Sequence, residues 1–334
     1  MAKNFKNFKE DYEQIRPALR KYFFNANNPV MNSSYAGELA LPYLSAAIKS
    51  GKTLANGYIT VKENIPFKAV LKNVSDDGNL IQNGACDYNE GGVITLAERT
   101  LVPEEFMVNT ELCKAKFRDD WEALATGSLY DGQIPPTFEE FLLSYIADKV
   151  AEKTENTIWG GNNASAGEFE GLATNNGVIV SGGGTVVTAS NPLDTGERIK
   201  DALGELFNDA GGILATASAI VDKEDFTIYV SPKVALLYQQ YLASLGYLNE
   251  YFINEKPLNY LGYEMVVCPG MLNDRIIAAR KSNLYFGTNL LTDHTSVRVI
   301  DRTPIDGSDN VRIAMRYSGG VQVGIISEAF CIKN

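Results

Sequence analysis

Residues 135–172 read PPTFEEFLLSYIADKVAEKTENTIWGGNNASAGEFEGL, and this stretch decides the fold. Two prolines at its start prevent a helix from running through them, and Thr137 and Glu140 have the spacing of a capping box. The apolar residues that follow recur at helical spacing: Phe138, Phe141, Leu142, Tyr145, Ile146, Val150 and Ile158. Glycines at positions 160 and 161 end the pattern. We therefore predict a long helix over residues 137–158 that packs Phe138, Leu142 and Tyr145 on a sheet.

β-Prone segments lie on both sides of this helix. Those before it are YITVKE, FKAVLKNV and GGVITLAERTLV, at residues 58–63, 67–74 and 91–102. Those in the C-terminal third are YEMVV, RIIAA, LYFG, SVRVID, VRIAMRY, VQVGII and EAFCI. In VRIAMRY, residues 311–317, an apolar side chain recurs at every second position, as in a half-buried strand. The order of elements predicts a mixed α+β fold whose segments return to shared sheets.

A further strand and two helices are expected between these β-rich regions. The first helix begins after Asp194 or Thr195 and has an apolar face made of Ile199, Ala202, Leu203, Leu206 and Phe207. The segment FTIYV, residues 226–230, is expected to be a short buried strand. Ser231 and Pro232 then cap and start the second helix.

Residues 68–92 predict a hairpin that projects from the body. Its apolar residues are few, and the segment VSDDGNL supplies Asp-Gly turn chemistry. A lone hairpin is marginally stable in water, so this one is expected to become ordered on a neighbouring molecule. The charged residues that could make contacts there are Lys68, Lys72, Asp76, Asp77 and Glu90.

The composition is that of an ordinary globular protein, with 334 residues, 45% of them hydrophobic and 21% charged. No apolar run approaches the roughly 20 residues that span a bilayer. The N-terminus lacks the apolar core of a secretory signal, so folding in a cytoplasm is expected. The four cysteines are far apart and form no CxxC pair, which argues against a zinc site and against a disulfide framework.

The formal charge of −11 is unevenly distributed. The N-terminal segment is basic and forms a candidate arm with Lys3, Lys6, Lys9, Arg16, Arg20 and Lys21. The remainder is more acidic than the total suggests. An acidic body lacks the dense basic surface that binds nucleic acid by counterion release, so sequence-specific binding is not expected.

A search for catalytic chemistry finds no recognisable site. The single histidine, His294, follows Asp293 in a turn-like stretch and has no nucleophile motif beside it. Neighbouring acids such as Asp119 and Asp120 point apart on a helix or strand, and solvated faces explain them. The glycine clusters lack the lysine of a phosphate-binding loop, so we predict that they form turns. We predict no catalytic residue, no cofactor and no metal.

The order of these segments resembles the tailed-phage major capsid proteins of the Hong Kong 97 fold. In that family a long spine helix and a glycine turn lie between β-rich regions, as in residues 137–172. The stretch VCPGMLNDRIIAARKSNLYFGTNLLTDHTSVRVID, followed by VRIAMRYSGGVQVGIISEAFCI, resembles the closing half of those subunits. GACDYNEGGVITLAERTLVPEEFMVNTEL is similar to the return strand of their extended loop, and FTIYVSPKVALLYQQYL resembles the strand–helix unit of their axial domain.

This resemblance implies a domain organisation. Residues 1–56 would be an N-terminal arm, and 57–110 would carry strands and the extended loop. Residues 111–194 and 286–334 would form the peripheral domain with the spine helix, and 195–285 the axial domain. The region before the first strand is short, which implies a separate scaffold protein rather than a fused one.

The resemblance also implies a function. The chain would assemble with itself, as pentamers and hexamers, into the icosahedral head shell of a tailed bacteriophage around double-stranded DNA. Expected partners are a scaffold protein, a portal and decoration proteins, with assembly in the host bacterial cytoplasm and no membrane. The basic arm would face the packaged DNA or the scaffold. Lys68 and Lys72 are loop lysines, but nothing marks an acceptor, so crosslinking is not expected.

Two alternatives stay open. Helical spacing between Phe5 and Tyr22 also fits an encapsulin-type nanocompartment shell, which encloses enzymes instead of a genome. A hydrolase with an unrecognised site is the alternative from another class. Purified particles would distinguish the three, because they would be filled with DNA, filled with enzyme, or absent.

Overall fold

The computed structural model describes residues 35–36, 51–76, 83–84, 92–113, 138–208, 211–217, 220–246, 258–289, 298–308 and 310–334. The basic arm (Lys3, Lys6, Lys9, Arg16, Arg20 and Lys21), Asp77, Glu90, Thr137 and His294 lie outside these residues, as do the side chains of Asp76, Phe138 and Leu142.

The chain divides into two compact units, each built from three segments. Unit one comprises Met1–Ala36, Val108–Ser144 and Val297–Met315, and unit two comprises Gly37–Met107, Tyr145–Ser296 and Arg316–Asn334. The long elements α5, β5 and β13 continue from one unit into the other. Both units are therefore assembled from distant parts of the sequence, as the recurring sheet segments predict.

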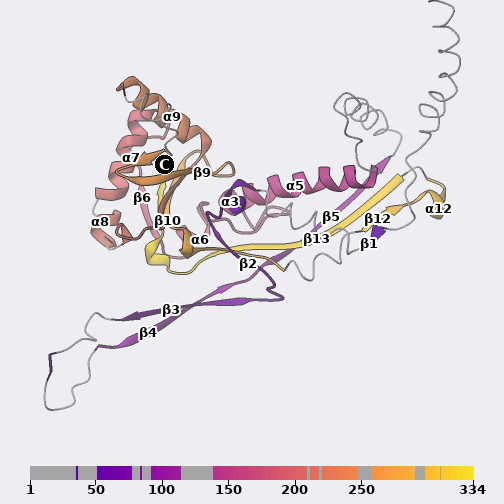
Figure 1. The fold of residues 1–334 in the computed structure, drawn as a ribbon, viewed down its shortest axis with the longest axis horizontal. Coiled ribbons are helices and arrows are strands. Elements are labelled where there is room, and N and C mark those ends of the chain that lie inside the picture. Colours follow the sequence, from indigo (N-terminus) through magenta and orange to yellow (C-terminus); the bar gives the residue numbers. More distant parts are fainter. Residues whose placement is uncertain are drawn as a thin grey trace, which may run out of the picture. The chain divides into compact units, whose positions relative to one another are not determined.

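A six-stranded sheet in unit two has the order β6-β14-β10-β7-β9-β8. Its strands are β6 (Thr185–Thr188), β7 (Phe226–Val230), β8 (Asn259–Tyr260), β9 (Tyr263–Val267), β10 (Arg275–Arg280) and β14 (Phe330–Lys333). The helices α7 (Gly196–Asn208) and α9 (Pro232–Ser244) pack against it (Figure 1). Short helices α6 (Val178–Ser181), α8 (Ile213–Thr216), η3 (Lys281–Asn283) and η5 (Ile326–Glu328) lie in the segments that lead into or out of its strands.

The predicted pattern of this region is confirmed at residue level. The five apolar residues expected on the first helix are the ones that α7 buries. All of β7 is buried. The side chain of Ser231 accepts a hydrogen bond from the N–H of Val234 at 3.2 Å, so it caps α9.

The predicted boundaries at residues 195 and 285 do not enclose this sheet. β6 and β14 were expected in the peripheral domain, but they pair with each other, and β14 pairs with β10. The physical reason is that every residue of β10 except Arg280 is buried, so this central strand needs a partner on both edges. The end of the chain supplies the second partner.

A second sheet has the order β1-β12-β13-β11-β2, and β5 pairs with β13 off this path. Its strands are β1 (Tyr35–Ala36), β2 (Thr60–Lys62), β5 (Glu104–Cys113), β11 (Leu284–Gly287), β12 (Arg298–Asp301) and β13 (Asn310–Val323). The helix α12 (Thr303–Asp306) connects β12 and β13, and α3 (Lys52–Ala55) precedes β2.

β13 is one strand of 14 residues, whereas the sequence predicts two strands separated at Ser318-Gly319-Gly320. The strand continues through the two glycines. Glycine is needed there because a neighbouring backbone segment lies too close for a side chain. A Cβ added to Gly320 would lie 2.9 Å from the carbonyl oxygen of Val102. The predicted alternation is confirmed, since Val311, Ile313, Met315 and Tyr317 are buried.

α5 (Phe138–Gly160) is the helix predicted over residues 137–158. Its buried residues follow i, i+4 spacing through Ile146, Val150 and Ile158. Tyr145, expected on this face, is 50% exposed. It lies beside the buried stripe, on the helix side that carries the exposed pair Lys149 and Glu152, which are joined by a 2.9 Å ion pair.

The turn after α5 needs glycine for close packing. A Cβ on Gly161 would lie 2.3 Å from the carbonyl oxygen of Phe169, and one on Gly171 would lie 2.6 Å from the backbone nitrogen of Gly161. The glycines that end the helical pattern in the sequence therefore let two backbone segments touch.

Candidate assembly interface

The predicted hairpin exists and is a separate two-stranded sheet. β3 (Ala69–Asp76) pairs with β4 (Ile94–Leu101) over eight residue pairs, from Ala69 with Leu101 to Asp76 with Ile94. Figure 1 shows the two strands side by side. No other described strand pairs with them. The hairpin thus has two free edges and two faces.

One face of the hairpin carries an apolar strip that is exposed to solvent. Side chains at every second position of a strand share a face, and directly paired residues lie on the same face. Val74 of β3 is paired with Leu96 of β4, and these residues are 65% and 55% exposed. We call the residues Val70, Val74, Ile94 and Leu96 the apolar strip. Strands that expose such residues on a monomer mark interaction sites or aggregation hazards.

The opposite face holds the root of the hairpin. Leu71 and Leu101 are buried in a small cluster with Ile65, and Tyr285 packs against it. The guanidinium of Arg99 donates a hydrogen bond to the carbonyl of Gly182, the C-cap of α6, at 3.1 Å. A cation at a helix C-terminus is favourably placed for the helix dipole. The root is therefore fixed, while the apolar strip is exposed and no described part of the chain is shown to cover it.

Two of the charged residues that were predicted to contact a neighbouring subunit, Lys72 and Lys68, have different surroundings. Lys72 forms an ion pair with Glu98 across the hairpin, with nitrogen and oxygen 3.6 Å apart and both side chains more than half exposed. Its nearest anion therefore belongs to its own hairpin. Lys68 is exposed. Exposed pairs of this kind contribute about 0–1 kcal/mol each.

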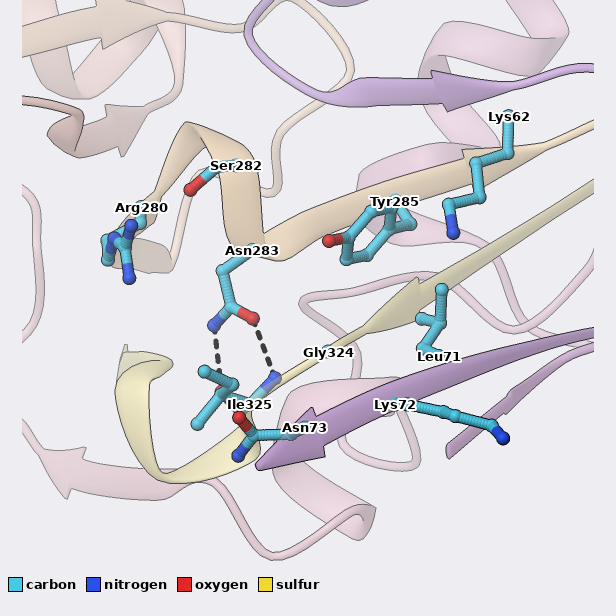
Figure 2. Close-up of a pocket in the computed structure, with 10 residues that line it drawn as sticks. All are labelled: Lys62, Leu71, Lys72, Asn73, Arg280, Ser282, Asn283, Tyr285, Gly324 and Ile325. Carbon is cyan, nitrogen blue, oxygen red and sulfur yellow. Dashed lines mark hydrogen bonds between the residues drawn. The ribbon is translucent and has the colours of Figure 1, made fainter. Parts of the chain in front are cut away.

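A polar pocket of about 290 Å³ lies at the hairpin root. It is lined by Lys62, Leu71, Lys72, Asn73, Arg280, Ser282, Asn283, Tyr285, Gly324 and Ile325 (Figure 2). Asn283 closes one wall because it donates to the carbonyl of Ile325 at 2.8 Å and accepts from the N–H of Ile325 at 2.6 Å. Arg280 is held by Asp225 at 2.9 Å and Glu328 at 3.3 Å. Its cations are therefore engaged, the hydroxyl of Ser282 donates a hydrogen bond to Asp225, and no acidic residue is among the lining residues.

A buried polar cluster holds the segment that precedes the hairpin. Glu155 of α5 accepts hydrogen bonds from both the N–H (3.1 Å) and the hydroxyl of Thr53. The indole of Trp159 donates to the same hydroxyl at 2.9 Å. The hydroxyl of Tyr229 donates to the carbonyl of Tyr58 at 2.9 Å, and burial raises its pKa well above the usual value. The chain is thus anchored a few residues before β2.

Unit one carries an exposed ionic network. Glu111 of β5 accepts hydrogen bonds from Arg312 at 2.9 Å and from Asn310 at 3.0 Å, and the guanidinium of Arg302 lies 3.8 Å away. These groups lower the pKa of Glu111, and the largest cause is the hydrogen bond from Arg312. Such a network can hold β5 to β13, but it has no buried reacting group.

The described residues show little that could support catalysis. Cys113, Cys268 and Cys331 are free thiols, and burial raises the pKa of Cys331 to about 11. A thiol of this kind is inert at neutral pH. In the described ranges, no group of three or more His, Cys, Asp or Glu side chains is placed to hold a metal ion. No helix among these residues has the length and apolar character needed to cross a membrane.

Half of the apolar strip was not predicted from the sequence. The predicted hairpin ended at residue 92, and only the apolar residues before that point were assigned to it. Ile94 and Leu96 lie on the return strand, where their period of two and their pairing with Asp76 and Val74 place them on the exposed face. The alternation in ITLAERTL was a readable signal for this face.

No family model matches the sequence. No curated protein matches it either. Solved structures do match the fold. The capsid of Myoviridae phage XM1 is 11% identical, with a TM-score of 0.53, over 85% of this chain and 92% of that one. The capsid of an empty GTA particle is 14% identical, with a TM-score of 0.51, over 95% and 97% of the two chains. A structure from Gordonia phage Cozz is 12% identical, with a TM-score of 0.51, over 85% and 86%.

These matches extend over most of both chains, and their low identity means that they show the fold alone. The chain therefore has the Hong Kong 97-like fold of tailed-phage capsid proteins, which its sequence predicts.

Proposed function

We propose that this chain is the major capsid protein of a tailed bacteriophage and forms an icosahedral head shell around double-stranded DNA. The observation that most strongly supports this proposal is the β3–β4 hairpin. Its root is fixed, its apolar strip is exposed, and it belongs to a phage-capsid fold. A shell subunit needs such a surface, because identical copies must cover one another's exposed groups around closed symmetry axes.

The energetics favour a second copy as the cover. A two-stranded hairpin is marginal in water by itself. Fully burying a Val, Leu or Ile side chain contributes about 1.5–3 kcal/mol, and the members of the apolar strip begin about half exposed. Burial of the strip then adds a few kcal/mol to each contact. The shell repeats that contact in every subunit, which offsets the entropy lost on association.

The proposal also covers the mode of action, the partners and the location of the protein. The subunit acts through binding surfaces and not as an enzyme. Its partners are itself in pentamers and hexamers, a separate scaffold protein, a portal and decoration proteins, and its place is the virion after assembly in the host cytoplasm. The basic arm (Lys3, Lys6, Lys9, Arg16, Arg20 and Lys21) meets DNA or scaffold at the inner surface.

The test is electron microscopy and sedimentation of the expressed chain, alone and with its scaffold. Closed particles tens of nanometres across that carry DNA when isolated from infected cells are expected. A monomer or dimer under all conditions, with turnover of a small molecule, would refute the capsid function. Particles filled with an enzyme would identify a nanocompartment shell instead.

A double variant tests the hairpin. Val74→Thr with Leu96→Thr places a strand-favouring β-branched residue at both positions but removes the paired apolar side chains. We expect a soluble, folded subunit that no longer closes into shells. The matched control is Thr95→Asn, an exposed substitution on the other face of β4, which should assemble normally. Normal shells from the double variant would show that the apolar strip is not the contact.

A further inference from the structure

The turn between β8 and β9 places a leucine in a conformation that leucine disfavours. Tyr260 pairs with Tyr263, so the turn consists of only two residues, Leu261 and Gly262. Both have positive φ, 52° and 88°. Two-residue turns of this kind favour Asn-Gly, because an asparagine tolerates the left-handed region and a leucine is strained there.

Little of the strained leucine is buried in its own fold. Its side chain is 69% exposed, the second most exposed large hydrophobic residue among the described residues after Phe67. Exposed apolar side chains are common when they occur singly. Here exposure coincides with backbone strain, and the two together are a typical mark of a functional position.

A groove lies directly beside this turn. Its volume is about 350 Å³, and its lining residues are Val221, Asp222, Lys223, Glu224, Phe226, Gly262, Tyr263 and Glu264. Gly262 belongs to both the turn and the groove. The floor is aromatic, since the rings of Phe226 and Tyr263 meet edge to face with centroids 5.2 Å apart. Leu261 is not among the residues that line it.

We propose that Leu261 of one copy of this chain inserts into the groove of the next copy. The inference rests on the proposed shell function, which requires heterologous contacts between identical chains. One chain carries both halves of the contact, an apolar projection and an aromatic-floored groove rimmed by charges. Since the two halves are adjacent on one chain, copies related by rotation can engage both only where these residues lie near the rotation axis. The contact therefore belongs to the centre of a pentamer or hexamer.

Disulfide trapping tests this contact directly. In the double variant Leu261→Cys with Glu224→Cys, one new thiol replaces the projection and the other stands on the exposed rim of the groove. Assembled particles are oxidised with copper phenanthroline and analysed by non-reducing electrophoresis. We expect a ladder that ends at five and six subunits. Each single variant is the matched control and should give no ladder beyond dimers.

The outcomes separate this inference from the proposed function. If wild-type particles form but the double variant assembles without a ladder, the contact is wrong and the shell function stands. If the wild type forms no particles, the proposed function fails. A second variant, Leu261→Asn, suits the turn and should fold normally while its yield of shells falls at least tenfold. Leu245→Asn, which removes another exposed leucine of unit two, should leave the yield unchanged. Equal yields from Leu261→Asn and the wild type would overturn the inference.

Discussion

The carboxylate of Glu155 accepts a hydrogen bond from the backbone N–H of Thr53 at 3.1 Å, across 102 residues of sequence. Both residues are buried, and the hydroxyl of Thr53 also donates to Glu155. This contact ties the chain that enters β2 to the C-terminal part of the long helix α5. β2 follows this contact, and the hairpin begins after β2 at Ala69, so the chain that leads to its root starts from a fixed point.

Replacing Glu155 with alanine should destabilise the subunit strongly. The change leaves the N–H of Thr53 buried without a partner, and such groups cost about 1–3 kcal/mol each. Chemical unfolding followed by circular dichroism measures the loss. The control is Glu152→Ala, an exposed position on the same helix, which should change stability by less than about 0.5 kcal/mol. A loss no greater than that of the control would show that the buried cluster does not hold the segment.

The two sides of α5 should respond differently to truncation. Ile158 is fully buried, so Ile158→Ala should cost about 2–5 kcal/mol of unfolding free energy. Tyr145 is half exposed, and Tyr145→Ala should cost much less in the isolated subunit. Thermal and denaturant unfolding of the two variants provide the comparison. Equal losses would mean that Tyr145 packs on the sheet after all.

The strained turn predicts a stabilising substitution. Asparagine tolerates the left-handed conformation that costs leucine roughly 1–2 kcal/mol, so Leu261→Asn should raise the unfolding free energy by about 1 kcal/mol. Leu261→Val should lower it, because a β-branched residue is worse in that region. Denaturant midpoints of purified monomers test both. A destabilised Leu261→Asn would contradict the turn geometry.

The loop after α12 should loosen in acid. The side-chain and backbone hydrogen bonds from Ser308, with Arg302 nearby, lower the pKa of Asp306 to about 2. A depressed carboxyl pKa adds stability above the unfolded value of 3.8, and this stability is lost as pH falls toward 2. The protection of residues 302–308 against hydrogen exchange, measured relative to the intrinsic rate at each pH, should therefore fall between about pH 4 and pH 2. In Asp306→Asn this protection should be low at both ends of the range, and a wild-type profile in that variant would exclude Asp306 as the cause.

Local sequence signals determined the elements of this protein. Prolines, caps, glycines and apolar spacing placed α5, α7, β7 and α9 within a few residues of their observed bounds, because these signals act over one or two helical turns. The hairpin was readable for the same reason, from its alternating strands and Asp-Gly turn. The order of those elements was enough to indicate the capsid fold.

Only the tertiary structure decided which distant segments meet. Nothing near Thr53 in the sequence marks Glu155 as its partner, and nothing in β14 shows that it completes the sheet beside β10. Helical periodicity placed Tyr145 on the buried face, but the buried stripe of α5 is displaced by one residue and runs through Ile146 and Val150. The positive φ of Leu261 is equally invisible in the sequence. It arises because Tyr260 and Tyr263 pair across two residues, a constraint set by the whole sheet.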